Sequence, residues 1–193
     1  AEEILERYRI VARATNDVIW DWSLDTDVAT YSEAVEAMLG YTPDEILNHR
    51  SWWKDNIHPD DRDALLERIE KAFASDAMTI SAEYRFRRAD GSYATVLDRA
   101  RILRDEDGRV VRVIGSMLDI TERKRAEERQ RFLAEASAIL DSSLDYDTRL
   151  RELARLCVPT PGDFCLVDLA EDDGTFRRIE AAHADPARAE VMR

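Results

Sequence analysis

The sequence predicts an α+β fold in which an antiparallel five-stranded sheet carries helices on one face. Two runs of alternating apolar residues, beginning at Val18 and Val28, predict a hairpin. Three further runs with the same period, within 80–118, are separated by Asp-Gly turns and predict consecutive antiparallel strands. Between these groups, residues 32–75 show helical spacing. This order of elements is typical of an α+β domain of about 110 residues.

The helical region divides into three parts. The first ends at Gly40, a residue that suits the left-handed conformation after a helix, and the second begins at Ser51. The third follows His58-Pro59 and places its apolar residues on one face, namely Leu65, Leu66, Ile69, Ala72 and Phe73. We expect Ser32 to cap the first helix and Asp60 or Asp61 to cap the third.

After the third sheet strand, the chain changes character. Residues 122–140 lack Gly and Pro and predict one long helix. Within it, Ala126, Leu133 and Leu140 repeat at heptad spacing, over fewer heptads than a firm coiled-coil assignment needs. A helix over 148–157 and strands over 164–169 and 176–182 follow. These last elements predict an incomplete second domain.

The N-terminal residues 1–14 predict an amphipathic helix. Its apolar stripe includes Ile4, Leu5 and Tyr8. Because a lone helix cannot bury such a stripe, we expect it to pack on the sheet or on a second subunit. A homodimer formed through this helix and the long linker helix is therefore expected.

Composition limits the possible partners. Asp and Glu outnumber Lys and Arg by 41 to 28, which gives a net charge of −13 and disfavours nucleic acid and anionic membrane surfaces. No apolar run reaches membrane-spanning length, so no membrane insertion is expected. The two cysteines, Cys157 and Cys165, resemble neither a zinc site nor a disulfide framework, and this favours a reducing cytoplasm.

Five short segments between residues 19 and 121 carry a family resemblance. They are Ile19-Trp20-Asp21-Trp22, Leu39-Gly40-Tyr41-Thr42-Pro43-Asp44-Glu45, His58-Pro59-Asp60-Asp61, Tyr84-Arg85-Phe86-Arg87-Arg88-Ala89-Asp90-Gly91 and Gly115-Ser116-Met117-Leu118-Asp119-Ile120-Thr121. Together they resemble a bacterial PAS domain with its C-terminal PAC segment, over 15–122. One departure is Thr95, at a strand position where such domains often carry Trp.

Two later segments, 163–169 and 177–186, resemble the first strands of a GAF domain. This resemblance implies a linker helix over 123–144 and an incomplete GAF-like domain over 145–193. Proteins with this layout are commonly cytoplasmic sensors that end in a histidine kinase, and a serine phosphatase or a cyclic-dinucleotide enzyme is a less frequent output. The segment itself is expected to transmit a signal and not to catalyse a reaction.

The inner face of the sheet is the predicted ligand pocket. Strand parity aligns Tyr84 with Phe86, and the resemblance places further pocket residues on the facing strands. The candidates are Trp20, Trp22, Tyr84, Phe86, Val96, Asp98, Val113 and Met117. An inward Asp98 needs a partner such as Tyr84, whereas a one-residue slip in register leaves it solvated. The alternative is a scaffold for dimerisation or partner docking, whose cavity is filled by its own side chains.

Bound cofactors find little support in the sequence. Haem needs an axial ligand, but residues 62–75 contain no His, Cys or Tyr, and the methionines at 38, 78 and 117 are more often packing residues. Flavin photochemistry of the LOV type needs a Cys that this region lacks. We therefore predict a purified chain without visible absorption, which an absorption spectrum checks. No metal site and no catalytic residues are expected, while an unknown small ligand, including non-covalent flavin, stays open.

Asp119, Ile120 and Thr121 join the predicted third strand to the long helix. Asp119 and Thr121 are good N-terminal capping residues, and Ile120 can anchor the helix apolarly. We expect this triplet to transmit movement from the cavity to the helix. The alternative is a plain helix cap with no signalling role.

Overall fold

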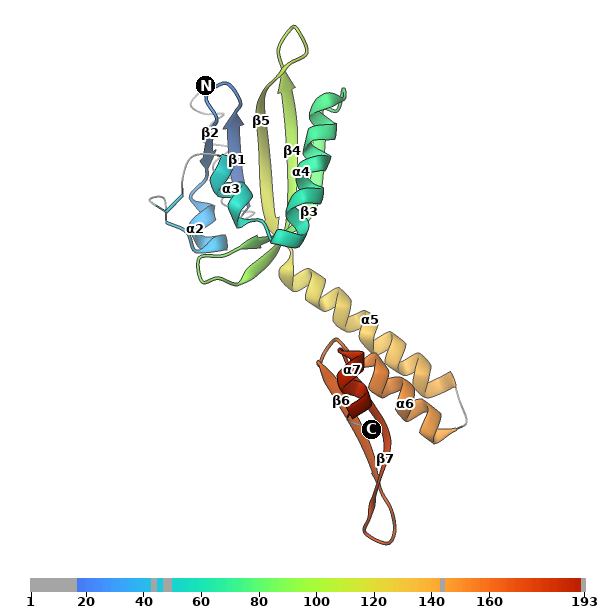
Figure 1. Cartoon of the computed structure of the whole chain (residues 1–193). Coiled ribbons are helices and arrows are strands. Elements are labelled where there is room, and N and C mark those ends of the chain that lie inside the picture. Colours follow the sequence, from blue (N-terminus) through green and yellow to red (C-terminus); the bar gives the residue numbers. More distant parts are fainter. Residues whose placement is uncertain (1–16, 43–44, 47–49, 143–144, 192–193) are drawn as a thin grey trace. The chain divides into compact units, whose positions relative to one another are not determined.

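The computed structural model describes residues 17–42, 45–46, 50–142 and 145–191. The chain divides into two compact units between Lys124 and Arg125, and each is described by itself (Figure 1). The predicted helix over 1–14, with Ile4, Leu5 and Tyr8, lies outside the described residues.

The first unit contains the predicted five-stranded antiparallel sheet. Its strands are β1 (Val18–Ser23), β2 (Val28–Tyr31), β3 (Thr79–Arg87), β4 (Tyr93–Arg104) and β5 (Val110–Asp119), in the spatial order β2-β1-β5-β4-β3. The first and last strands are direct neighbours, and Val18 lies opposite Met117. This pairing brings the N-terminal hairpin beside the strand that leads into the long helix.

Three helices accompany this sheet, namely α2 (Ala34–Leu39), α3 (Arg50–Asn56) and α4 (Pro59–Ala74). Helix α2 ends at Gly40, whose φ of 79° is left-handed, as predicted. Trp52 from α3 and Leu65 from α4 join the hydrophobic core with residues from one side of the sheet, which we call the inner face. The α+β fold class and the sheet predicted from the sequence are confirmed.

Both predicted helix caps are wrong, for a shared physical reason. The Ser32 hydroxyl accepts a hydrogen bond from the Ile19 backbone N–H at 3.0 Å, in the neighbouring strand. At α4 the cap is His58, whose Nδ1 accepts from the Asp60 N–H at 3.2 Å. Asp61 instead binds the Arg85 guanidinium at 2.6 Å. Long-range partners in the sheet therefore take the side chains that local rules assign to caps.

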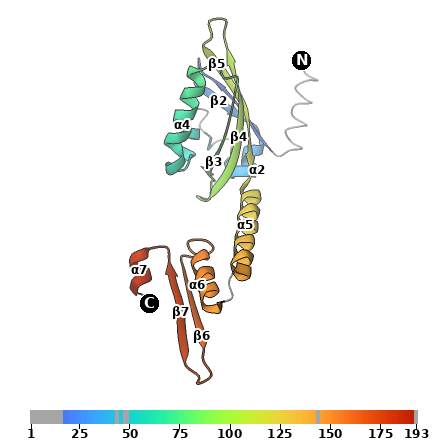
Figure 2. The same cartoon turned by 90° about the vertical axis from the view of Figure 1, so that its right-hand side faces the viewer.

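Helix α5 (Thr121–Ser142) crosses the boundary between the units, and the second unit continues with α6, a hairpin and a short helix. These elements are α6 (Tyr146–Leu156), β6 (Phe164–Ala170), β7 (Phe176–His183) and α7 (Pro186–Val191), shown in Figure 2. Helix α6 packs on the hairpin, where Ala154 and Ile179 are buried. Phe164 and Phe176 are exposed. Within the described part of the chain, no helix has the length and apolar content needed to cross a membrane.

Candidate ligand cavity and signalling joint

A cavity of about 70 Å³ lies between the inner face of the sheet and helices α3 and α4. Its walls are mostly apolar and aromatic, and its two charged lining residues are Asp98 and Arg50. The complete lining is Trp20, Trp22, Ala29, Tyr31, Arg50, Trp53, Leu65, Ile69, Phe73, Ile80, Ala82, Tyr84, Asp98, Ala100 and Val113. Apolar walls with a few convergent polar groups are typical of small-molecule sites.

Asp98 is the centre of a buried hydrogen-bond network. Its Oδ2 accepts from the Tyr84 hydroxyl at 2.7 Å, and its Oδ1 accepts from Trp20 Nε1 at 2.9 Å. The Trp53 Nε1 donates in turn to the Tyr84 hydroxyl at 2.8 Å. The network joins β1, β3, β4 and α3, and it fixes the orientation of three aromatic rings around one carboxylate.

Burial dominates the electrostatics of this network. It raises the pKa of Asp98 from 3.8 to about 6, although the hydrogen bonds from Tyr84 and Trp20 oppose the shift. Burial, followed by the Asp98 charge, also raises the pKa of Tyr31. The Asp98 carboxyl group is thus buried where ionisation costs desolvation free energy. Many functional sites contain ionisable groups of this kind.

Five of the eight predicted pocket residues line the cavity, and three do not. Trp20, Trp22, Tyr84, Asp98 and Val113 are in the lining. Phe86, Val96 and Met117 share the inner face but are enclosed in the hydrophobic core, with relative exposures of 0%, 0% and 1%. Strand parity predicts which face of the sheet a side chain lies on. Which side chains on that face line the cavity depends on the packing of the helices against the sheet.

Several cavity residues were not predicted from the sequence. Tyr31 follows the inward parity of Ala29 in β2, and this alternation could have identified it. The apolar face of α4, predicted from its periodicity, supplies Leu65, Ile69 and Phe73 to the wall. Arg50 has no comparable sequence signal, because its position depends on how α3 meets the sheet.

Gly115 provides the space for the Trp20 ring. It pairs with Trp20 across β1 and β5, and an added Cβ would lie 2.5 Å from Trp20 Cζ2 and 2.7 Å from the Arg99 carbonyl oxygen. We expect Gly115→Ala to lower the free energy of unfolding by about 1–3 kcal/mol, because a backbone oxygen cannot move aside cheaply. Urea unfolding followed by Trp fluorescence measures this loss. The neighbouring Ser116→Ala is the control, and equal stability of both variants would contradict the assigned packing.

The joint between sheet and helix is formed by Asp119, Ile120 and Thr121. The Asp119 carboxylate accepts from the Thr121 backbone N–H at 2.8 Å and pairs with Arg88. Ile120 is 3% exposed, and its N–H donates to the Thr95 carbonyl at 2.8 Å. The Thr121 hydroxyl accepts from the Thr95 N–H at 2.9 Å. Both backbone groups of Thr95 are therefore bonded to the joint.

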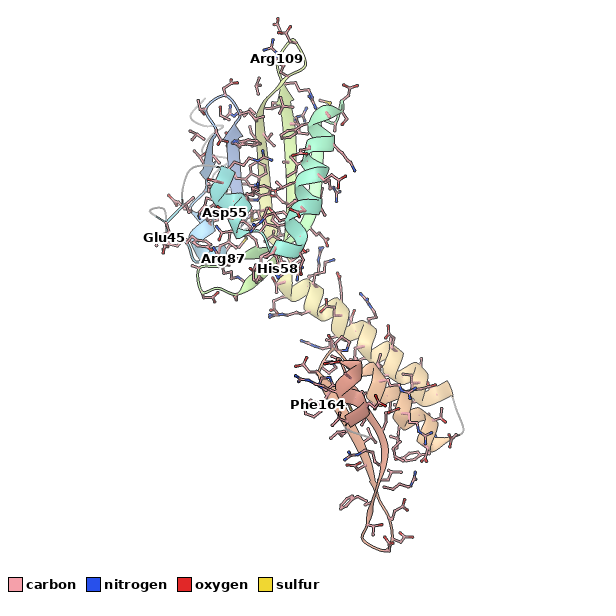
Figure 3. All side chains as sticks on the ribbon, in the orientation of Figure 1. Glu45, Asp55, His58, Arg87, Arg109 and Phe164 are labelled. Carbon is pink, nitrogen blue, oxygen red and sulfur yellow. The ribbon has the colours of Figure 1, made fainter. Side chains whose placement is uncertain are left out.

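Further polar contacts hold the first turn of α5 to the sheet. Lys124 Nζ lies 2.6 Å from a Glu83 carboxylate oxygen on β3. Burial opposes ionisation of Asp119, but its hydrogen bonds with Thr121 and Arg88 outweigh this effect and lower its pKa. Figure 3 shows His58 and Arg87 at the same end of the first unit as this joint, and Arg109 at the opposite hairpin tip.

Comparisons with known proteins agree with this fold. Residues 28–117 match the family model described as "PAS fold". The crystal structure of a sensory box histidine kinase/response regulator from Burkholderia thailandensis E264 superposes with a TM-score of 0.58 at 27% identity, over 67% of this chain and 95% of that chain. Residues 28–117 of the first unit therefore form a domain with the PAS fold.

Two of the curated relatives are named as sensors, and both are much longer than this chain. The methyl sulfide methyltransferase-associated sensor of Methanosarcina acetivorans is 36% identical over 107 residues, which cover 55% of this chain and 10% of that protein. The two-component sensor PprA of Pseudomonas aeruginosa is 31% identical over 119 residues, covering 57% and 12%. The chain thus spans about a tenth of the length of these sensors.

Proposed function

We propose that this chain is a sensory module whose PAS cavity binds a small ligand and whose α5 helix carries the signal to a C-terminal output. The observation that carries the proposal is the continuity from cavity to helix. Val113 of β5 lines the cavity, and the same strand ends at Asp119, which accepts a hydrogen bond from the first turn of α5. A ligand that shifts β5 therefore shifts the origin of α5.

The proposed output is a histidine kinase in the cytoplasm, with a serine phosphatase as the less favoured candidate. Likeness to a two-component sensor and to a sensory box histidine kinase supports this choice. In this proposal, residues 15–122 form the PAS domain with its PAC segment, 123–144 the signalling helix and 145–193 the start of a GAF-like domain. Homodimerisation through the N-terminal and linker helices belongs to the same proposal. The segment itself transmits and does not catalyse.

A scaffold without ligand is the second candidate, and one specific observation favours it. The cavity of about 70 Å³ is small, and the Trp20 and Tyr84 side chains already satisfy one oxygen each of Asp98. In that case, the aromatic residues complete the core and the domain serves dimerisation or partner docking.

Native mass spectrometry of the purified chain separates the two candidates. A sensor is expected to retain a small molecule in at least part of the population, and denaturation should release it. Repeated absence of any bound mass, from several expression conditions, would favour the scaffold. The Gly115→Ala variant, in which the Trp20 ring is displaced, should lose the retained molecule if that molecule occupies the cavity.

Signal transmission through α5 predicts a dependence of output on helix register. Inserting one alanine after Glu122 in the full-length protein rotates all later helix positions by about 100° while leaving the Asp119 cap in place. We expect kinase output to change or invert as one to six residues are inserted. Partial recovery is expected with seven, because a heptad restores the seam of a helical pair. Autophosphorylation assays measure the output.

The seven-residue insertion is the internal control for this series. It lengthens the helix but returns the later residues to nearly the same side of the helix axis. Output that is the same at every insertion length would show that α5 is a tether. The signalling role of Asp119, Ile120 and Thr121 would then be withdrawn, and they would remain a helix cap.

A further inference from the structure

Two opposite charges face the same cavity without pairing with each other. Asp98 receives its side-chain hydrogen bonds from the neutral donors Trp20 and Tyr84, and within the described part of the chain no cationic side chain pairs with it. The Arg50 guanidinium lies over the Trp22 ring, 4.7 Å from its centroid, and has no carboxylate partner among the same residues. A buried charge is costly unless an opposite charge compensates it.

The groups around this cavity have unused bonding capacity. An ionised carboxylate has about four acceptor sites, and Trp20 and Tyr84 each take one at Asp98. Tyr31 lines the cavity, and its hydroxyl has no hydrogen-bond partner in the described residues. Arg50 contributes guanidinium donors, whose planar geometry suits a carboxylate. A ligand can therefore gain bonds at both charges without breaking the existing network.

We propose that the cavity takes a small zwitterion, with its ammonium group at Asp98 and its carboxylate at Arg50. This inference rests on the proposed ligand-binding function and names the class of ligand. Only a molecule with both charges compensates both residues, since Arg50 repels a simple amine and Asp98 repels a simple carboxylate. The aromatic walls favour the ammonium end by cation–π attraction and, by excluding water, strengthen both ion pairs.

The size of the cavity limits the length of this ligand. Its volume of about 70 Å³ is below the roughly 150 Å³ of a protein cavity that admits benzene. The ligand class is thus a short amino acid, in which few atoms separate the two charges.

Calorimetric titration of the purified chain tests the proposal. The compounds are glycine, β-alanine and γ-aminobutyrate, in which the charges are progressively farther apart. Ethylamine and propylamine carry only the positive charge, propionate and butyrate only the negative charge, and propanol neither. We expect one zwitterion to bind at least tenfold more tightly than every compound that lacks one of its charges.

Two substitutions assign the charges to their residues. Asp98→Asn and Arg50→Gln should each weaken binding of that zwitterion at least tenfold. Asp98→Asn should not weaken the binding of a simple carboxylate such as propionate. Arg50→Gln should not weaken the binding of a simple amine such as ethylamine. Arg101→Gln is the matched control, because Arg101 is exposed and outside the cavity lining, and it should leave the affinity unchanged. If Asp98→Asn does not fold, Arg50→Gln at the half-buried Arg50 still tests the proposal.

Each other outcome overturns the proposal in a recognisable way. If an amine binds as tightly as the zwitterion, Arg50 does not contribute to ligand recognition and the proposal is wrong. If only propanol binds, or if native mass spectrometry shows another retained molecule and no zwitterion binds, the zwitterion proposal is wrong. The proposed sensor function would not be contradicted by either result. Absence of binding by every compound, together with no retained molecule, would overturn both.

Discussion

Phe86→Ala is expected to lower the free energy of unfolding of the first unit by about 3–5 kcal/mol. Phe86 is 0% exposed, and its ring centroid lies 5.7 Å from that of Trp52 and 6.4 Å from that of Tyr84. Its backbone also bridges to Ile57, just before α4. The substitution therefore removes a large buried surface and leaves a cavity where the sheet meets the helices. Small domains have total stabilities of about 5–15 kcal/mol, so this loss is a large fraction.

Urea unfolding monitored by Trp fluorescence measures this effect. The protein has 4 Trp residues, at 20, 22, 52 and 53, and all belong to the first unit, so the signal reports on that unit alone. Met78→Ala is the control, because Met78 is 61% exposed and its replacement should change stability by less than about 0.5 kcal/mol. A loss below about 1 kcal/mol for Phe86→Ala would show that Phe86 does not hold the core together.

The strands of the first unit could be predicted because each has a local cause. Alternation sets which residues face inward, and the Asp-Gly turns supply Gly91 and Gly108, whose φ angles of 84° and 82° suit few other residues. The pairing of β1 with β5 has no such local cause. It joins Trp20 to Gly115, 95 positions later, and only the packing of the whole sheet selects it. Helix caps were mispredicted for a similar reason, because Asp61 finds Arg85 in a distant strand.

The parts of the candidate site that depend on alternation within one strand could be predicted from the sequence, and the parts that depend on strand pairing could not. The inward position of Asp98 follows from strand parity once the register is known, and Tyr84 is the partner that an inward Asp98 was expected to need. The second partner, Trp20, depends on the β1 and β5 pairing and on the space left by Gly115. A glycine inside a strand pattern often marks such a close approach, so Gly115 was a usable signal. No such sequence signal identified Arg50, because its position beside the cavity depends on how helix α3 packs against the sheet.

The buried carboxylate of Asp98 makes stability depend on pH in a direction opposite to that of most carboxylates. Asp98 is 8% exposed, and its pKa in the folded protein is about 6 against 3.8 in the unfolded chain. Below about pH 4 the group is protonated in both states, and above about pH 6 it is ionised in both. Between these values the folded protein keeps a proton that the unfolded chain has lost.

Asp98 therefore stabilises the fold most at low pH, and this contribution falls as pH rises from about 4 to about 6. A pKa difference of about two units corresponds to about 3 kcal/mol. Asp98→Asn has no charge to lose, so its free energy of unfolding lacks this decrease. The stability of the wild-type chain minus that of Asp98→Asn is thus expected to decrease by about 2 kcal/mol between pH 4 and pH 7, because part of the total decrease occurs below pH 4.

Urea unfolding of both proteins at pH 4, 5, 6 and 7 measures this difference, and the subtraction cancels the titration of the other carboxylates. A constant offset is expected as well, because the side-chain amide of the Asp98→Asn variant has one acceptor oxygen for the two donors, Trp20 and Tyr84. Only the change of the difference with pH carries the prediction. Asp107→Asn, at a carboxylate that is 72% exposed and lies outside the cavity, is the matched control substitution. A difference that rises with pH would show that the Asp98 network stabilises the ionised carboxylate more than burial penalises it, and the electrostatic description of the cavity would have to be reversed.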